Sequence, residues 1–146
     1  MSEADDSRRA LLGHVLVPVA QEADARKTAR GLAPYDPDQV TAVHVVEKAG
    51  GAPDKTPVEH SHEVAADCYA AIQSVFPAAD THTAYGRNVV ETILQAADEV
   101  GATAIVYRSR GGNRLMHFLS GDQSLKLVTR ADRPVIALPR AEDDER

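Results

Sequence analysis

The sequence alternates short apolar runs with longer stretches whose apolar residues recur at helical spacing. A short run rich in β-branched residues and bounded by polar sequence is typical of a buried strand, whereas helical spacing of apolar residues is typical of a helix with one buried face. Strands are expected at residues 14–20, 40–47, 81–85, 102–107 and 134–139. Helices are expected at residues 22–33, about 58–75, 89 to at least 97, and 122–130, and residues 48–60, rich in glycine, proline and charge, are expected to be a mobile loop.

Strands that alternate with helices of this length predict βαβ units and therefore a parallel sheet covered on both faces. At 146 residues the chain has the length of one domain. We therefore expect an α/β fold, a single-domain three-layer αβα sandwich with a five-stranded, mostly parallel sheet. Ligands of such folds bind beyond the carboxyl ends of the strands, which lie here at Val19–Ala20, Val45–Val46 and Tyr107–Arg108.

The two ends of the chain are acidic, which sets the expected domain limits. Residues 1–10 are expected to be a flexible acidic N-terminus, residues 11–140 the folded domain, and residues 141–146 an acidic C-terminal tail. The formal net charge of −6 argues against a nucleic-acid partner, because non-specific binding depends on neutralising phosphates.

Targeting and redox signals favour a cytoplasmic protein. The N-terminus is acidic before its first apolar run, the reverse of a secretory signal, and no apolar stretch approaches the ~20 residues of a membrane span. The single cysteine, Cys68, cannot form an intrachain disulfide, which favours a reducing compartment.

Neither a catalytic set nor a metal site is evident. The sequence lacks a Walker motif and a Gly-x-Ser-x-Gly elbow. His60 and His62 lie in a segment expected to be a loop or a fraying helix start, where no ligand geometry is fixed. His44, in the middle of a strand, is expected to be a satisfied core residue. The sequence therefore predicts a protein that is not an enzyme.

The stretch RSRGGNRLMHFLSGDQS, residues 108–124, has the outline of a loop that wraps a phosphate chain. It contains glycines, a long middle and a polar helix start, and helix N-termini offer free amide donors that suit an anion. An arginine, however, stands at its first position, and Asp122 stands at the start of the helix.

In the order of its predicted elements and in the sequence of several segments, the chain resembles the universal stress protein family. The resemblance rests on VLVPVA, VHVVE, GRNVVETILQAADEVGATAIVY and GDQSLKLVTRADRPVIALPR taken together and in this order. It implies the UspA-like fold of the adenine-nucleotide alpha-hydrolase type, and a dimer formed through the last strand. We expect Val135, Ile136, Ala137 and Leu138 at that interface, since pairing with a second copy satisfies an open sheet edge; the alternative is an ordinary edge strand.

Members of that family that bind ATP share a glycine, two residues, a second glycine, nine residues, and a third glycine followed by serine or threonine. Aligned on Gly121 and Gly111, the first glycine position is occupied here by Arg108 and the hydroxyl position by Asp122. Such members also carry an aspartate after the Pro-x of the first strand, where this chain has Ala20. The spacing is kept, but three ligand-facing positions have changed.

Each change disfavours a triphosphate. A side chain at Arg108 occupies volume that a glycine leaves to the ligand, and Ala20 lacks an acceptor for hydroxyl groups. Asp122 either caps the last helix or pairs with Arg108 across the loop, and the two interpretations are compatible. Conversely, Arg108, Arg110 and Arg114 could hold a different anion, because arginine is a natural partner of phosphate; the alternative is a solvated basic loop.

The predicted function is that of a universal stress protein-like homodimer, a non-catalytic regulatory protein of the stress response that acts through an unknown protein partner. No cofactor is expected. The alternative is a sensor that binds ATP, AMP or another anion through residues 108–124, with Val19 and Val45 flanking the base. The residues assigned to the cleft are Val19, Ala20, Val45, Tyr107, Arg108, Arg110, Gly111, Gly121, Asp122, Gln123 and Ser124.

Overall fold

The computed structural model describes residues 10–47, 55–108 and 121–139. The strands in these ranges are β1 (Val15–Val19), β2 (Val40–Glu47), β3 (Asp80–Gly86), β4 (Ala104–Arg108) and β5 (Val135–Leu138). The helices are α2 (Glu22–Leu32), α3 (Lys55–Val75), α4 (Val89–Val100) and α5 (Gly121–Arg130), with a 3-10 turn, η1 (Ala33–Tyr35), after α2.

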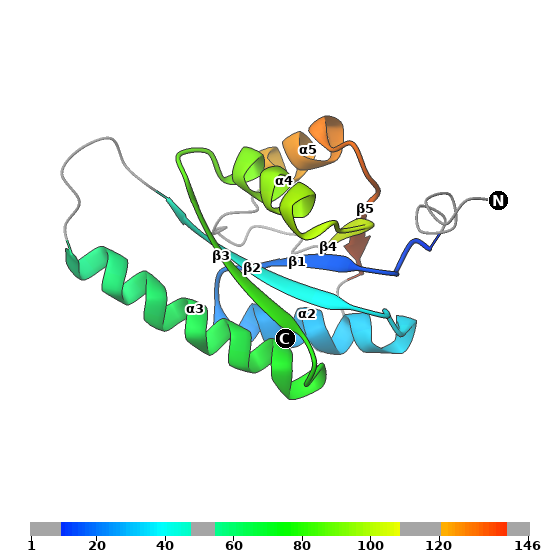
Figure 1. The fold of residues 1–146 in the computed structure, drawn as a ribbon, viewed down its shortest axis with the longest axis horizontal. Coiled ribbons are helices and arrows are strands. Elements are labelled where there is room, and N and C mark those ends of the chain that lie inside the picture. Colours follow the sequence, from blue (N-terminus) through cyan, green and yellow to red (C-terminus); the bar gives the residue numbers. More distant parts are fainter. Residues whose placement is uncertain (1–9, 48–54, 109–120, 140–146) are drawn as a thin grey trace.

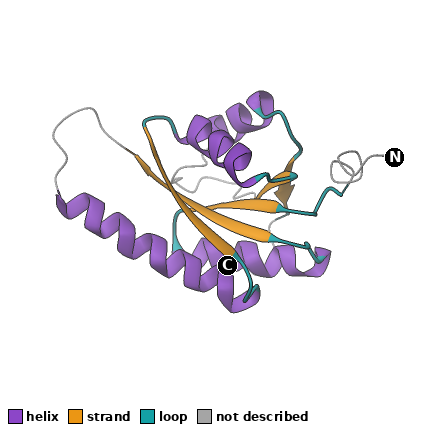
Figure 2. Ribbon diagram, in the orientation of Figure 1, coloured by secondary structure: helices purple, strands orange, loops and turns teal. Residues whose placement is uncertain are grey.

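The strands form one parallel sheet in the order β3-β2-β1-β4-β5. Helices α2 and α3 cover one face and α4 and α5 cover the other, so the molecule has three layers (Figures 1 and 2). The expected αβα sandwich is confirmed, and the sheet is wholly parallel. Because β2 lies on one side of β1 and β4 on the other, the strand order reverses at the β1–β4 boundary.

The central strand β1 is buried along its whole length. Val15, Val17 and Val19 pack among the residues of α2 and α3, whereas Leu16 packs on the opposite face among those of α4 and α5. A strand buried on both faces has no polar side to present, which explains the unbroken apolar run VLVPV.

Two local features fix α4 against the sheet. Asn88 caps the helix, since its side-chain oxygen accepts a 3.0 Å hydrogen bond from the Glu91 amide. Gly86, at the end of β3, packs so closely on the first turn of α4 that a Cβ there would lie 2.1 Å from Oγ1 of Thr92. The turn from β3 into α4 therefore requires glycine.

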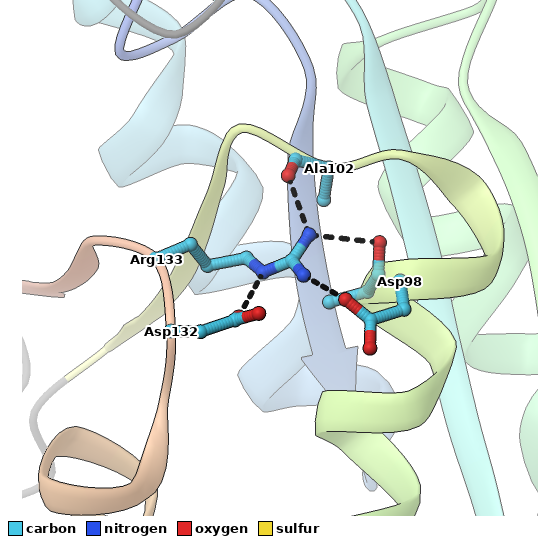
Figure 3. Close-up of polar contacts among 5 residues, drawn as sticks. Asp98, Ala102, Asp132 and Arg133 are labelled. Atoms are coloured by element: carbon cyan, nitrogen blue, oxygen red, sulfur yellow. Dashed lines mark hydrogen bonds and ion pairs between the residues drawn. The ribbon is translucent and has the colours of Figure 1, made fainter.

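Arg133 ties the segment before β5 to the end of α4 (Figure 3). Its guanidinium donates hydrogen bonds to the carbonyl oxygens of Ala97 and Ala102, at 3.1 and 2.7 Å, and contacts the carboxylates of Asp98 and Asp132. The carbonyls at a helix C-terminus lack partners within the helix and attract positive charge. This half-buried arginine adds to the backbone amides of Gly101 and Ala102 that already cap the end of α4, and it anchors the chain that enters β5.

One expected boundary is wrong. Residues 48–60 were expected to be a loop, but α3 begins at Lys55, so residues 55–60 are helical; residues 48–54 lie outside the described ranges. Pro57 is compatible with this start, because the first turn of a helix does not need the amide that proline lacks. His60 and His62 accordingly lie on α3.

Candidate functional site

The carboxyl ends of β1 and β4 form the position where this fold places ligands. Here α2 leaves β1 toward one face of the sheet, while the chain after β4 leads to α5 on the other face. In folds of this kind ligands bind beyond the carboxyl ends of the strands, at the point where strand order reverses. Ala20, directly after β1, and Arg108, the last residue of β4, lie at this point.

Arg108 reaches across this position to α2. Its Nη2 atom lies 3.1 Å from Oδ1 of Asp24, in the first turn of α2, and forms both a hydrogen bond and an ion pair. The arginine side chain is 8% exposed and that of the aspartate 24%, so water competes only weakly for the contact. Charge-assisted hydrogen bonds of this type are roughly twice as strong as neutral ones. The pair links the end of β4 to the start of α2.

The start of α2 is also unfavourable for a phosphate. Glu22 and Asp24 place two carboxylates in its first turn, where the helix dipole stabilises negative charge. Gln21, at the N-cap, makes no capping hydrogen bond through its side chain. Both carboxylates are ion-paired, Glu22 with Arg26 at 3.0 Å and Asp24 with Arg108 at 3.1 Å, so a phosphate approaching these amides would compete with both pairs.

The structure describes the other predicted cleft residues unevenly. Tyr107 is half-buried on β4, and Gln123 and Ser124 are half-buried at the start of α5. Gly121 and Asp122 are the first two residues of α5, but their side chains are outside the description, as are Arg110 and Gly111 altogether. A contact between Arg108 and Asp122 therefore stays a prediction; Asp24 is the partner that the sequence reasoning missed.

Val19 and Val45, predicted to flank a base, lie on opposite faces of the sheet. Val19 packs in the cluster shared with α2 and α3, whereas Val45 packs against the cluster shared with α4 and α5. The two residues lie on neighbouring strands but on opposite faces of the sheet, because Val19 pairs with His44 and side chains alternate along a strand. That both flank a nucleobase stays a prediction, in which they would contact the base from opposite faces of the sheet.

His44, beside Val19 on β2, is buried but only partly satisfied. It is 6% exposed, and its Nδ1 atom has no hydrogen-bond partner among the described residues. Burial lowers the pKa of the imidazole, and the charge of His62 lowers it further. The expectation of a satisfied core histidine is therefore half right: the ring is in the core, with one nitrogen unpaired.

The expected dimer strand, β5, lies at the edge of the sheet. Ala137 is exposed, while Val135 and Ile136 are half-buried. Leu138 differs from the other three, because its side chain is 4% exposed and belongs to the core beneath α2. Contacts of β5 with another molecule would therefore use its backbone and the first three side chains.

Within the described ranges, no helix combines the length and the hydropathy that a membrane span requires. Within the same ranges, no three histidine, cysteine, aspartate or glutamate side chains come together in a group that could hold a metal ion.

Comparison with protein families decides the relationship. The family model described as "Universal stress protein family" matches residues 11–139. The chain belongs to the universal stress protein family. A search of curated proteins gave no significant match.

Solved structures of universal stress proteins share the fold. The protein UspA from Lactobacillus plantarum is 25% identical, with a TM-score of 0.59 over 86% of this chain and 96% of that one. A universal stress protein from Archaeoglobus fulgidus in complex with dAMP is 21% identical, with a TM-score of 0.58 over 85% and 95% of the two chains. Another universal stress protein, in complex with cAMP, is 11% identical, with a TM-score of 0.62 over 86% and 95%.

Proposed function

We propose that this universal stress protein is a non-catalytic homodimer of the stress response, which acts through protein partners and whose nucleotide cleft is closed by its own side chains. The observation that carries the proposal is the ion pair between Arg108 and Asp24, which spans the position where the fold places ligands. Family membership supports the role in the stress response.

The proposed closure has a simple physical basis. In the ATP-binding pattern of the family the position of Arg108 is a glycine, which lets a ligand approach the backbone. Here the guanidinium is held at that strand end by a carboxylate and is largely shielded from water. A nucleotide would have to displace the arginine and leave the Asp24 carboxylate facing its phosphates. Breaking a partly buried charged hydrogen bond costs about 1.5–3 kcal/mol, which weakens binding about tenfold or more.

Calorimetric titration with ATP and magnesium, repeated with AMP, tests the closed cleft. We expect no saturable heat from the native chain, and micromolar binding after Arg108→Gly combined with Asp122→Ser. Adding Asp24→Asn should strengthen binding further, because it removes a negative charge from the same position. Saturable micromolar binding by the native chain, or no gain in either variant, would contradict the closure.

Co-purified ligand gives an independent check. The chain has no tryptophan and four tyrosines, so bound adenine would raise the absorbance at 260 nm well above that of the protein. We expect none from the native chain.

The proposed dimer pairs β5 with β5 of a second copy across a two-fold axis. An edge strand presents unpaired backbone groups, and a second copy satisfies them. Replacing the exposed Ala137 by proline should give a monomer in sedimentation experiments, since proline removes a backbone donor and cannot be accommodated in a central strand. A native chain that sediments as a monomer would contradict the dimer.

The second candidate function is a sensor that binds a nucleotide or another anion. It is favoured by the complexes of other universal stress proteins with dAMP and cAMP, and by the arginine at the end of β4. In this arrangement Arg108 would exchange Asp24 for a phosphate. The titrations above distinguish the two functions, since a sensor binds AMP or ATP without any substitution.

A further inference from the structure

The edge of the sheet opposite β5 has the features of a docking site. Strand β3 pairs with β2 along seven residues, and among the described strands it has no neighbour on its other side. Strands at an edge are commonly protected by proline, by inward-pointing charge or by being very short. β3, with the sequence DTHTAYG, is a full-length strand without proline or lysine. Its outer side can therefore accept another strand.

A hollow lies directly beside this edge, between β3 and α4. It is called the β3–α4 hollow below, and its volume is about 240 Å³. Its lining consists of His82, Thr83, Ala84, Tyr85, Thr92, Gln95, Ala96 and Glu99. Both walls belong to elements held by the Gly86 contact and the Asn88 cap. A side chain of a strand added to β3 would find this space next to its own backbone, because side chains alternate between the two faces of a sheet.

The chemistry of the β3–α4 hollow selects positive charge. Glu99 is the acidic residue in its lining; its side chain is 52% exposed, and Oε2 lies 3.2 Å from Nε2 of His82. The carbonyl oxygen of the Gln95 side chain offers a second hydrogen-bond acceptor in the same wall. A lysine or arginine side chain entering the hollow could form an ion pair with the Glu99 carboxylate, which already lies in its lining.

The surrounding sequence extends this preference. Residues 56–107, which include α4, β3 and nearly all of α3, contain one basic residue, Arg87. The same range contains seven acidic residues: Glu59, Glu63, Asp67, Asp80, Glu91, Asp98 and Glu99. Glu91 and Asp98 are paired with arginines of the α5 side, whereas Asp80 accepts from Gln39 and remains exposed. Such an imbalance attracts a cationic partner over about one Debye length, ~10 Å in moderate salt.

We propose that the outer side of β3 and the β3–α4 hollow bind an extended, basic segment of a partner protein, which adds a strand to the sheet and places a lysine or arginine against Glu99. Main-chain hydrogen bonds supply affinity in this mode of recognition, and the pocket for alternate side chains supplies specificity. The proposal deepens the regulatory function proposed above by naming the partner chemistry.

A second copy of the chain is the less favourable occupant. Each copy carries a net charge of −6, and pairing β3 with its symmetry mate would bring two acidic sheet edges together. A basic segment meets the opposite charge instead, so charge complementarity decides between the two.

The test uses the full chain and a fluorescein-labelled ten-residue peptide of alternating threonine and lysine, with alternating threonine and glutamate as the matched control peptide. Fluorescence anisotropy measures affinity, and amide chemical shifts of the isotope-labelled chain locate the site. We expect the lysine peptide to bind, to shift amides of β3 and α4 rather than those of β5, and to bind more weakly as salt increases. Glu99→Gln should weaken binding about 1.5- to fivefold, the range for one exposed charge pair. The control Asp132→Asn removes the same charge near the opposite edge of the sheet and should leave affinity unchanged.

Several results would overturn the proposal. These are no binding of the lysine peptide, equal binding of the glutamate peptide, shifts outside β3 and α4, or equal effects of the two substitutions. Signals of β3 that broaden with protein concentration in the absence of peptide would identify a second copy as the occupant. Sedimentation and nucleotide titration of the same sample test the dimer and the closed cleft independently, so failure of this proposal is distinguishable from failure of the proposed function.

Discussion

Replacing Arg133 by glutamine should destabilise the protein by an amount that its hydrogen bonds determine. Glutamine keeps part of the aliphatic stem but cannot reach both carbonyl groups that arginine joins, those of Ala97 and Ala102. The arginine side chain is 14% exposed, so most of its contacts are shielded from water. The substitution therefore removes one of the groups that cap the end of α4, where the Ala97 carbonyl still accepts from the Ala102 amide, and it removes an anchor from the start of β5.

The magnitude can be worked from these contacts. A hydrogen bond from a charged group contributes about 1.5–3 kcal/mol, and two such bonds set an upper limit of about 6 kcal/mol. Water reaches the end of an exposed helix once the arginine is gone, which recovers roughly half of this. We expect a loss of about 2–3 kcal/mol in the free energy of unfolding, or about 5–10 °C in Tm for a domain of this size.

Urea denaturation followed by circular dichroism measures the loss, and Asp98→Asn is the matched control. The Asp98 side chain is 65% exposed, so its ion pair with Arg133 contributes less than about 1 kcal/mol. A large loss in the Asp98 variant, or a loss below about 1 kcal/mol in Arg133→Gln, would refute the view that the carbonyl bonds dominate. Arg133→Lys should fall between, because one ammonium group cannot reproduce the planar fork.

Three further outcomes follow from buried groups. His44 has a pKa below its ordinary value of 6.5, so as the pH falls the imidazole of the unfolded chain is protonated before that of the folded chain. The free energy of unfolding should therefore be independent of His44 above about pH 6.5. It should fall as the pH decreases toward the folded pKa, by at most about 1.4 kcal/mol per pH unit. His44→Gln should flatten this dependence in urea denaturation at pH 7.5 and 5.5, and an unchanged slope would contradict it. Burial raises the pKa of the Cys68 thiol to about 12, so a thiol reagent at pH 8 should label the chain only in denaturant. Rapid labelling of the native chain would contradict this, because it would show that the thiol is accessible. Gly86→Ala should cost about 1–3 kcal/mol through its clash with Thr92, and much less in a Thr92→Ala background; equal costs in both backgrounds would rule out the clash.

The order of elements was predictable because β1, β2, β4 and β5 are largely apolar and alternate with helical patterns, whereas β3, with the sequence DTHTAYG, is mainly polar. Strand β2 begins and ends where predicted, because polar residues flank Val40–Glu47 on both sides and end its apolar pattern. The start of α3 was not predictable in the same way. Glycine, proline and charge mark a loop on average, but Pro57 lies in the first turn, where a helix tolerates it.

The site shows a different limit. That Arg108 occupies a glycine position was visible in the sequence, but its partner Asp24 lies 84 positions away, and only the fold brings the two together. A signal existed in principle: Asp24 lies one turn into the helix that follows the first strand, which the strand order places beside β4. The β3–α4 hollow gave no signal at all, because a cavity depends on how side chains of two elements fail to fill the space between them.

The position of β1 at the centre of the sheet has a consequence for synthesis of the chain on the ribosome. β1 is made first among the strands, and β2 can pair with it soon afterwards. Its other edge must wait for β4: the amide of His14, at the entrance to β1, finds its partner Thr103 only 89 positions later. Until that segment emerges, the nascent chain carries an apolar strand with one open side, the kind of surface that chaperones bind and that promotes aggregation. Slow translation at any point before β4 has emerged would prolong this exposure.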